Sequence, residues 1–191
     1  VSRPTARQAL QRLVDRGLLT RRRGVGTIVS PRHVHRPMEL TSLMRDLVDA
    51  GHKVHTTIQR YEARPANAQE ADALKIAEGT LIVHIERTRF ANDEPIAVLT
   101  NAIPTDIAPT MQELESGSLY DLMRERGVTL ASARQVIGAR SATTKEAKLL
   151  SEHRGAALLT TQRTTYDPSG RIVEYGDHIY RASRYSFEAS L

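Results

Sequence analysis

The chain has 191 residues, of which 40% are hydrophobic and 26% are charged, and it contains no cysteine. Disulfide frameworks, thiolate metal sites, iron–sulfur clusters and thiol nucleophiles are therefore excluded. No run of residues approaches the roughly 20 apolar residues that a membrane span requires, and the first residues do not resemble a signal peptide. We expect a globular, cytoplasmic protein with no cofactor and no membrane partner.

The net charge of +5 is unevenly distributed along the chain. Residues 1–37 contain nine arginines and a single acid, Asp15, whereas the remaining 154 residues carry a net charge of −3. A basic segment of this kind is typical of proteins that contact the phosphates of nucleic acid. A solvated, charged helix surface is the alternative, and nine arginines to one acid favour nucleic acid over it.

The pattern of the basic segment predicts one helix followed by a hairpin. Ser2 can cap a helix, and Pro4 in the first turn is tolerated because its missing N–H has no partner there. Gly17 suits the residue that ends a helix, and 18–20 and 27–29 predict two short strands joined by a glycine-containing basic turn. Apolar residues recur at three- and four-residue spacing and predict one apolar stripe along the helix: Ala6, Ala9, Leu10, Leu13 and Val14.

A short helix followed by an arginine-tipped hairpin is the outline of a winged helix-turn-helix, whose helix enters the major groove of DNA. Residues 1–29 resemble, without a gap, the GntR family of bacterial transcription regulators. The resemblance rests on Ser2-Arg3-Pro4-Thr5-Ala6-Arg7-Gln8-Ala9-Leu10, Leu13-Val14-Asp15-Arg16-Gly17-Leu18-Leu19 and Arg23-Gly24-Val25-Gly26-Thr27-Ile28-Val29. The family's module begins with two further helices, so the resemblance implies the C-terminal part of that module and leaves open whether this chain binds DNA alone.

The resemblance implies DNA contacts for the helix. Arg3 and Arg7 are expected to read base edges, above all guanine O6 and N7, because the planar guanidinium fork matches these two acceptors. Ser2 and Thr5 are expected to bind phosphate through hydroxyl groups or helix-end amides.

The wing and the segment after it complete the basic region. Gly24 would let the wing backbone approach DNA closely, with Arg23 beside it. Residues 30–37 contain two prolines and little apolar periodicity, which predicts a linker. His33 and His35 are a weak metal signal because no acid or thiol lies near them, and we expect no metal site.

The rest of the chain contains an internal repeat. A shift of 76 residues aligns 42–103 with 118–179 without a gap, and 15 of the 62 aligned pairs are identical. Chance would give about four identities at ordinary residue frequencies. The period is too long for a solenoid, so the duplication predicts two halves of one pseudo-symmetric domain.

Each half has the pattern helix, strand, helix and strand hairpin. The expected elements are 42–50, 54–63, 68–76, 81–90 and 95–103, then 118–126, 130–141, 144–151, 157–166 and 171–181. Gly51 and Gly127 are expected to end the first helix of each half, and Thr143 with Glu146 has the spacing of a capping box. Three strands per half predict an α+β fold: a winged-helix remnant followed by a six-stranded, mainly antiparallel sheet with helices packed on it.

The odd positions of the strand 81–90 share one face, which is apolar at its start and ends in Arg87 and Arg89. Burying a guanidinium group is costly unless an anion meets it, so this pattern indicates an anion site. The alternatives are that these arginines lie at the solvent end of the sheet or pair with the protein's own carboxylates. On the last strand the pattern places four residues on one face: Ile172, Glu174, His178 and Tyr180.

Residues from about 38 to 187 resemble the ligand-sensing UTRA domain of the HutC subgroup of GntR regulators, which has a chorismate-lyase-like fold. The resemblance rests on Arg87-Thr88-Arg89, Asp93-Glu94-Pro95-Ile96-Ala97, Ser118-Leu119-Tyr120, Ala133-Arg134-Gln135, Arg163-Thr164-Thr165-Tyr166, Val173-Glu174-Tyr175, Tyr180-Arg181 and Arg184-Tyr185-Ser186-Phe187. It implies three parts: the winged-helix remnant at 1–29, the linker at 30–37 and the effector-binding domain at 38–191.

The resemblance also implies an effector site. Arg87 and Arg89 would clamp an anionic group of the effector, a phosphate or carboxylate, by charge-assisted hydrogen bonds. Thr41, Ser42 and Leu43 would supply hydroxyl and free N–H groups to the same anion. Two further residues, Glu174 and Tyr180, would contact the polar body of the ligand. Arg134 is either a ligand contact or part of a structural ion pair.

Two departures from the family pattern refine the expected chemistry of the effector. Sugar-sensing members carry a carboxylate where this chain has Leu99, and many relatives have glutamate where it has Gly138. We therefore expect a smaller or more apolar anion than a sugar phosphate.

The repeat adds a prediction of its own. Ser118 and Arg163 match Ser42 and Arg87, which predicts a relic anion site in the second half, weakened because Thr165 replaces Arg89.

The sequence thus predicts a ligand-responsive bacterial transcription regulator, a repressor, that binds operator DNA as a homodimer because a two-fold operator requires a two-fold protein. One alternative is a chorismate-lyase-like enzyme of small carboxylates, for which Glu174 and His178 are the only acid–base pair. We expect no catalytic residue, since no other catalytic motif is present. A second alternative is an effector-binding fragment without DNA activity.

Overall fold

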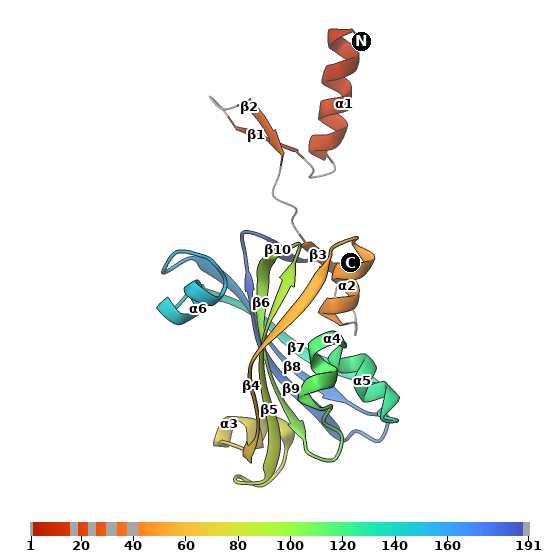
Figure 1. The fold of residues 1–191 in the computed structure, drawn as a ribbon, viewed down its shortest axis with the longest axis vertical. Helices are drawn as coiled ribbons and strands as arrows, with labels where there is room; N and C mark the ends of the chain where they lie inside the picture. The colour runs from red at the N-terminus through yellow and green to blue at the C-terminus, as the bar shows by residue number, and fades with distance from the viewer. Residues whose placement is uncertain (1, 16–18, 23–25, 30–33, 38–41, 189–191) are drawn as a thin grey trace.

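The computed structural model describes residues 2–15, 19–22, 26–29, 34–37 and 42–188 (Figure 1). The elements up to the first half of the repeat are α1 (Arg3–Asp15), β1 (Leu19–Arg22), β2 (Gly26–Val29) and β3 (Val34–Pro37). The first half contains α2 (Leu43–Asp49), β4 (Val54–Pro65), α3 (Ala68–Leu74), β5 (Leu81–Ala91) and β6 (Glu94–Pro104). After α4 (Met111–Ser116), the second half contains α5 (Leu119–Glu125), β7 (Ser132–Ser141), α6 (Thr144–Leu149), β8 (Ala157–Tyr166) and β9 (Ile172–Arg181), and β10 (Tyr185–Glu188) follows. None of the described helices is long and apolar enough to cross a membrane.

The N-terminal segment has the predicted helix and hairpin. The Oγ atom of Ser2 accepts a hydrogen bond from the Thr5 backbone N–H at 3.4 Å, which caps α1. Strands β1 and β2 pair antiparallel, with Leu19 opposite Val29. On the predicted apolar stripe, Leu10 is 42% exposed, and the described part of the chain places no apolar surface over it.

The repeat forms a single six-stranded antiparallel sheet in the order β4-β5-β6-β9-β8-β7. The last strands of the two halves, β6 and β9, pair at its centre, so the two halves are related by a pseudo-two-fold axis between them. The predicted fold class and strand number are confirmed.

Matching local structures in the two halves confirm the duplication. Gly51 and Gly127 follow the first helix of each half with φ of +78° and +79°, a conformation that glycine adopts without a steric cost. Thr143 and Glu146 form the predicted capping box at α6. Asn67 caps α3 in the same way at the equivalent place in the first half.

The equivalence shifts by one residue in the inner strands. Arg89 lies opposite Ala97 across β5 and β6, whereas its equivalent Thr165 lies opposite Glu174 across β8 and β9. Equivalent residues of β6 and β9 are therefore 77 positions apart rather than 76. The cause is the turn between the strands. Four residues separate the paired Phe90 and Pro95 in the first half, whereas five separate the equivalent pair Tyr166 and Ile172 in the second. The ungapped alignment holds through β5 and β8 and is wrong by one residue beyond them.

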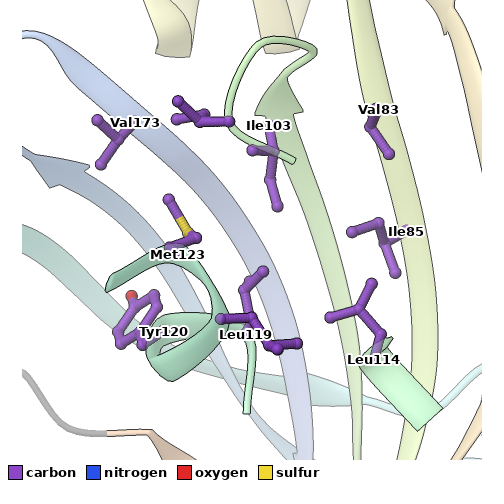
Figure 2. Packing of buried hydrophobic residues seen from close by; sticks show 10 residues of the cluster. Val83, Ile85, Ile103, Leu114, Leu119, Tyr120, Met123 and Val173 are labelled. Carbon is purple, nitrogen blue, oxygen red and sulfur yellow. The ribbon is translucent and has the colours of Figure 1, made fainter. Parts of the chain in front are cut away.

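Helices cover both faces of the sheet (Figure 1). α2, α4 and α5 lie on one face, and α3 and α6 lie on the other. Figure 2 shows the core under α4 and α5, where Leu114 and Met123 pack against Ile85 and Ile103, all fully buried. Leu119 and Tyr120 at the start of α5 belong to this core and also lie beside Arg87 and Arg89 of β5.

Residues 34–37, in the second part of the predicted linker, form the short strand β3, which pairs in parallel with β10, Val34 opposite Tyr185. One sequence expectation is wrong at the start of β9. Ile172 does not share the face of Glu174, because the pairing register shifts at the start of β9. Ile172 packs instead against the cluster on the α3 face.

Candidate functional site

Arg87 and Arg89 are both buried, each only 2% exposed, on the face of β5 that α2 and α5 cover. Arg87 Nη2 donates a hydrogen bond to Asn101 Oδ1 at 2.8 Å, and Arg89 Nη1 donates one to Thr56 Oγ1. Arg87 Nε and Nη1 and Arg89 Nε have no hydrogen-bond partner among the described residues. Neither side chain forms an ion pair with a carboxylate of the described residues, so two buried positive charges lie side by side without a direct counter-ion.

Burial opposes the charge of both groups. It lowers the pKa of Arg87 to about 10, an effect that the nearby Glu174 partly offsets. It lowers the pKa of Arg89 to about 9, and the charge of Arg87 adds to this decrease. A buried cation of this kind is stabilised when an anion binds to it.

The two guanidinium groups border a cavity of about 40 Å³. Its walls are the starts of α2 and α5 and the inward-facing residues of β5, β6, β8 and β9. The residues of the predicted effector site that line it are Ser42, Leu43, Arg87, Arg89, Glu174 and Tyr180. Thr41 lies outside the described residues. The structure therefore brings together six of the eight residues that the sequence analysis predicted as effector contacts.

Arg134 and Gly138 lie on the opposite face of the sheet. Arg134 is exposed on β7 and lines a separate cavity of about 840 Å³. A Cβ atom on Gly138 would point at Thr160 Oγ1, 2.9 Å away on that same face, so the missing glutamate at this position has no bearing on the smaller cavity. The larger cavity has no buried, unpartnered polar side-chain atom among its described lining residues, and we therefore assign the site to the smaller one.

Glu174 is fully buried on β9 and accepts three hydrogen bonds. Asn101 Nδ2 donates to Oε1 at 2.6 Å, and Thr165 Oγ1 and Tyr120 OH donate to Oε2 at 2.7 and 3.2 Å. Burial raises the pKa of Glu174 above its usual value despite these donors. Asn101 thereby links Arg87, which donates to its amide oxygen, to the carboxylate of Glu174.

Several residues of the cavity were not predicted as effector contacts. They are Met44, Leu99, Asn101, Leu119, Tyr120, Arg163 and His178. The repeat was the signal for Arg163, which donates to Gln135 Oε1 at 2.7 Å and to Tyr120 OH at 3.4 Å. Strand alternation was the signal for His178, which the pattern placed on one face with Glu174 and Tyr180. Asn101 carried no such signal, because its place depends on how β6 and β9 pair.

The predicted DNA contacts are described only in part. Ser2, Thr5 and Arg7 are exposed on and before α1. Arg3 lies in the first turn of α1, and its side chain is outside the described set. Arg23 and Gly24 lie outside the described residues.

Comparison with known proteins identifies the family. The UTRA domain matches residues 49–186, and the model of bacterial regulatory proteins of the gntR family matches residues 1–29. The chain belongs to the GntR family and carries a UTRA domain. It is 34% identical to the HTH-type transcriptional repressor NagR of Bacillus subtilis over 190 residues, 98% of this chain and 78% of that protein. It is 32% identical to the probable transcriptional regulator PhnF of Escherichia coli over 193 residues, 98% of this chain and 79% of that protein.

Solved structures show the same fold. The crystal structure of PhnF from Mycobacterium smegmatis superposes with a TM-score of 0.89 at 24% identity and covers 100% of this chain and 85% of that one. A putative transcriptional regulator from Streptomyces coelicolor is 49% identical, with a TM-score of 0.67 over 72% of this chain and 92% of that one.

This GntR-family protein is therefore a ligand-responsive transcriptional regulator of the HutC type, and the enzymatic alternative is not favoured, because the matched family consists of regulators. Asn101 Nδ2 lies 2.6 Å from Glu174 Oε1 and 3.2 Å from His178 Nε2, so it contacts both residues of the acid–base pair that the enzymatic alternative names.

Proposed function

We propose that the effector of this regulator is a small anion, a phosphate or a carboxylate, that binds to Arg87 and Arg89. The observation that carries the proposal is the pair of buried guanidinium groups whose free N–H groups have no partner in the described chain. A buried, unpaired charge costs several kcal/mol, and a bound anion with charge-assisted hydrogen bonds offsets that cost.

The dimensions and lining of the cavity favour a compact ligand. A volume of about 40 Å³ has room for roughly three water molecules, which suits one anionic group rather than a whole sugar. Leu99 is buried in the wall and offers no hydrogen bond to a sugar hydroxyl group. Ser42, whose Oγ accepts from the Met44 N–H at 3.2 Å, places the first turn of α2 beside the same space. Thr41, which precedes Ser42 in the sequence, and Glu174 and Tyr180 complete the proposed site.

Thermal unfolding tests the effector proposal. Inorganic phosphate, small phosphate monoesters, acetate and other small carboxylates are titrated. A ligand that binds the native state raises Tm with its concentration. We expect Arg89→Gln to weaken binding at least about tenfold, since a charge-assisted hydrogen bond contributes about 1.5–3 kcal/mol. Arg134→Gln, an arginine on the opposite face of the sheet, is the matched control and should leave the affinity unchanged. Binding of neutral sugars alone, or equal losses in both variants, contradicts the proposal.

We also propose that this protein binds operator DNA in the cytoplasm as a homodimer, through α1 and the wing, the hairpin that contains β1 and β2. In this proposal, residues 1–29 form the DNA-binding part, residues 30–37 form the connection, and residues 38–191 form the effector domain. Arg3 and Arg7 would contact bases, and Ser2 and Thr5 would contact phosphates. On the wing, Arg23 and Gly24 would approach the backbone. Support comes from the net positive charge of this segment and the exposed position of Arg7 on α1.

Binding of operator and random DNA tests this part, measured by fluorescence anisotropy in a form that includes the whole winged-helix module. Arg3→Ala and Arg7→Ala should each reduce discrimination by about 1–3 kcal/mol, the contribution of a bidentate base contact. Arg12→Ala, an exposed arginine of the same helix, should weaken binding to both DNAs alike. Full discrimination in the Arg3 and Arg7 variants contradicts the assignment, and a monomer in analytical ultracentrifugation contradicts the homodimer.

A further inference from the structure

Ala97 and Glu174 occupy equivalent positions in the two halves of the sheet. Ala97 on β6 lies opposite Arg89 on β5, and Glu174 on β9 lies opposite Thr165 on β8. The ungapped repeat hides this equivalence, because it aligns Glu174 with Val98 on the other face. Only the pairing register shows that one half has a carboxylate where the other half has a methyl group.

In the second half, the protein itself supplies an anion. The carboxylate of Glu174 is fully buried and accepts from Thr165 and Tyr120 of its own half and from Asn101 of the other half. Arg163, the equivalent of Arg87, also donates to the Tyr120 hydroxyl group and lines the same cavity. Of the two residues that the repeat predicts for a relic anion site, Arg163 thus shares the Tyr120 hydroxyl group with the carboxylate of Glu174, whereas Ser118 does not line this cavity.

In the first half, the donors are present and the carboxylate is missing. Ala97 is fully buried and presents a methyl group opposite Arg89. Arg87 and Arg89 both have buried N–H groups without a partner in the described chain, whereas Arg163 has no atom in that state. Ser118 Oγ and Thr161 Oγ1 of the second half also lack a partner among the described residues, so the contrast between the halves concerns the arginines. The arginines of the first half face the methyl group of Ala97, whereas Arg163 shares its cavity and the Tyr120 hydroxyl group with the carboxylate of Glu174.

We propose that Glu174 is a resident anion: its carboxylate fills in the second half the position that the effector's anionic group takes in the first half, beside Ala97 and against Arg87 and Arg89. One free anion therefore binds per chain, although the fold contains two equivalent anion positions. The part concerning the effector rests on the proposed function, and the part concerning Glu174 does not. The ligand group that fits is a carboxylate or an oxyanion of similar size, because a carboxylate fills the equivalent position.

Chemical rescue tests the position of Glu174. The variant Glu174→Ala leaves a space for a small carboxylate among the same donors, so formate or acetate should raise its Tm by several degrees more than chloride does at equal ionic strength. The wild-type protein should show no such rise from the second position. Glu174→Gln fills the space with a neutral side chain of the same shape, so formate should stabilise it no more than the wild type. Equal formate effects in all three proteins overturn the proposal.

The converse variant tests the first half. Ala97→Glu supplies a carboxylate beside Arg89 and should abolish the binding of inorganic phosphate, whereas Ala97→Gln, which has the same size but no charge, should retain more of it. A folded Ala97→Glu protein that binds phosphate with wild-type affinity overturns the proposal. Because Ala97 is fully buried and the larger side chain can prevent folding, the rescue of Glu174→Ala decides the proposal independently.

The two experiments separate this inference from the proposed function. If formate rescues Glu174→Ala while the wild type binds no anion at Arg87 and Arg89, the effector assignment fails and the resident anion stands. If phosphate binds the wild type through Arg89 and formate rescues nothing, the effector site stands and the resident anion is refuted.

Discussion

The rings of Tyr180 and Tyr185 stack with their centroids 4.4 Å apart and their planes at 18°. Tyr180 lines the cavity beside Arg87 and Arg89, and Tyr185 begins β10, which pairs with β3. Both rings are only 1% exposed. The stack therefore connects the wall of the cavity to the strand that precedes the effector domain, on the path toward the DNA-binding segment.

Removal of the Tyr185 ring should strongly destabilise the protein. Tyr185→Ala is expected to lower the free energy of unfolding by about 3–5 kcal/mol, the usual loss when a buried aromatic side chain is truncated. Urea denaturation measures the change. Tyr185→Phe keeps the ring and the stack and should lose no more than about 1.5 kcal/mol. A small loss in Tyr185→Ala would show that the β3–β10 pair does not depend on this contact.

The substitution Gly176→Ala should disturb the cavity that Glu174 and His178 line. A Cβ atom there would lie 2.6 Å from both Glu174 Oε1 and His178 Nε2, so both side chains must move. We expect Gly176→Ala to weaken anion binding about tenfold, equivalent to about 1.4 kcal/mol, in a titration followed by calorimetry.

The matched control is Gly138→Ala, in which the new methyl group meets Thr160 Oγ1 at 2.9 Å on the opposite face. This variant should lose some stability and keep the affinity for the anion. Equal loss of affinity in both variants would indicate a general effect on folding rather than displacement of Glu174 and His178.

The ion pair of Arg140 with Glu146 should give the protein acid sensitivity. Arg140 donates to both carboxylate oxygens, at 2.8 and 2.6 Å, and this contact is the main cause that lowers the pKa of Glu146 to about 2. The folded-state pKa lies below the unfolded value, so the stability from Glu146 is complete above about pH 4.5 and is lost as the pH falls through 2. Urea denaturation at pH 7 and pH 3 should show a smaller decrease in Glu146→Gln than in the wild type. Because Arg140 is partly exposed, we expect a loss of only about 0.2–1 kcal/mol at pH 7.

The equivalent pair of the first half should contribute more. Arg64 donates to both oxygens of Glu70 at 2.7 Å, and the side chain of Glu70 is only 8% exposed and also lies 3.1 Å from His84 Nδ1. Glu70→Gln leaves more buried polar groups without a charged partner, and we expect a loss of about 1–3 kcal/mol. Glu70→Gln and Glu146→Gln remove equivalent ion pairs of the two halves, so comparing their losses of unfolding free energy tests the effect of burial. A larger loss in Glu146→Gln contradicts the argument from burial.

Local patterns predicted most elements of the domain. Helix caps such as that of Thr143, the glycines after α2 and α5 and the alternation that places Arg87 and Arg89 on one face all depend on residues close in sequence. The repeat then placed these elements in two halves. α4 escaped prediction because it is a six-residue helix between the halves and has no counterpart in the duplicated pattern.

The amino-acid sequence alone therefore determined the family, the α+β class, the duplication and the arginines that mark the cavity, because these follow from local spacing and from similarity. Only the tertiary structure decided which face Arg134 and Gly138 occupy, that residues 34–37 pair with β10, and that Glu174 corresponds to Ala97. The physical reason is strand register: hydrogen bonds between distant strands and the lengths of their turns set it, and a shift of one residue moves a side chain to the other face of a sheet.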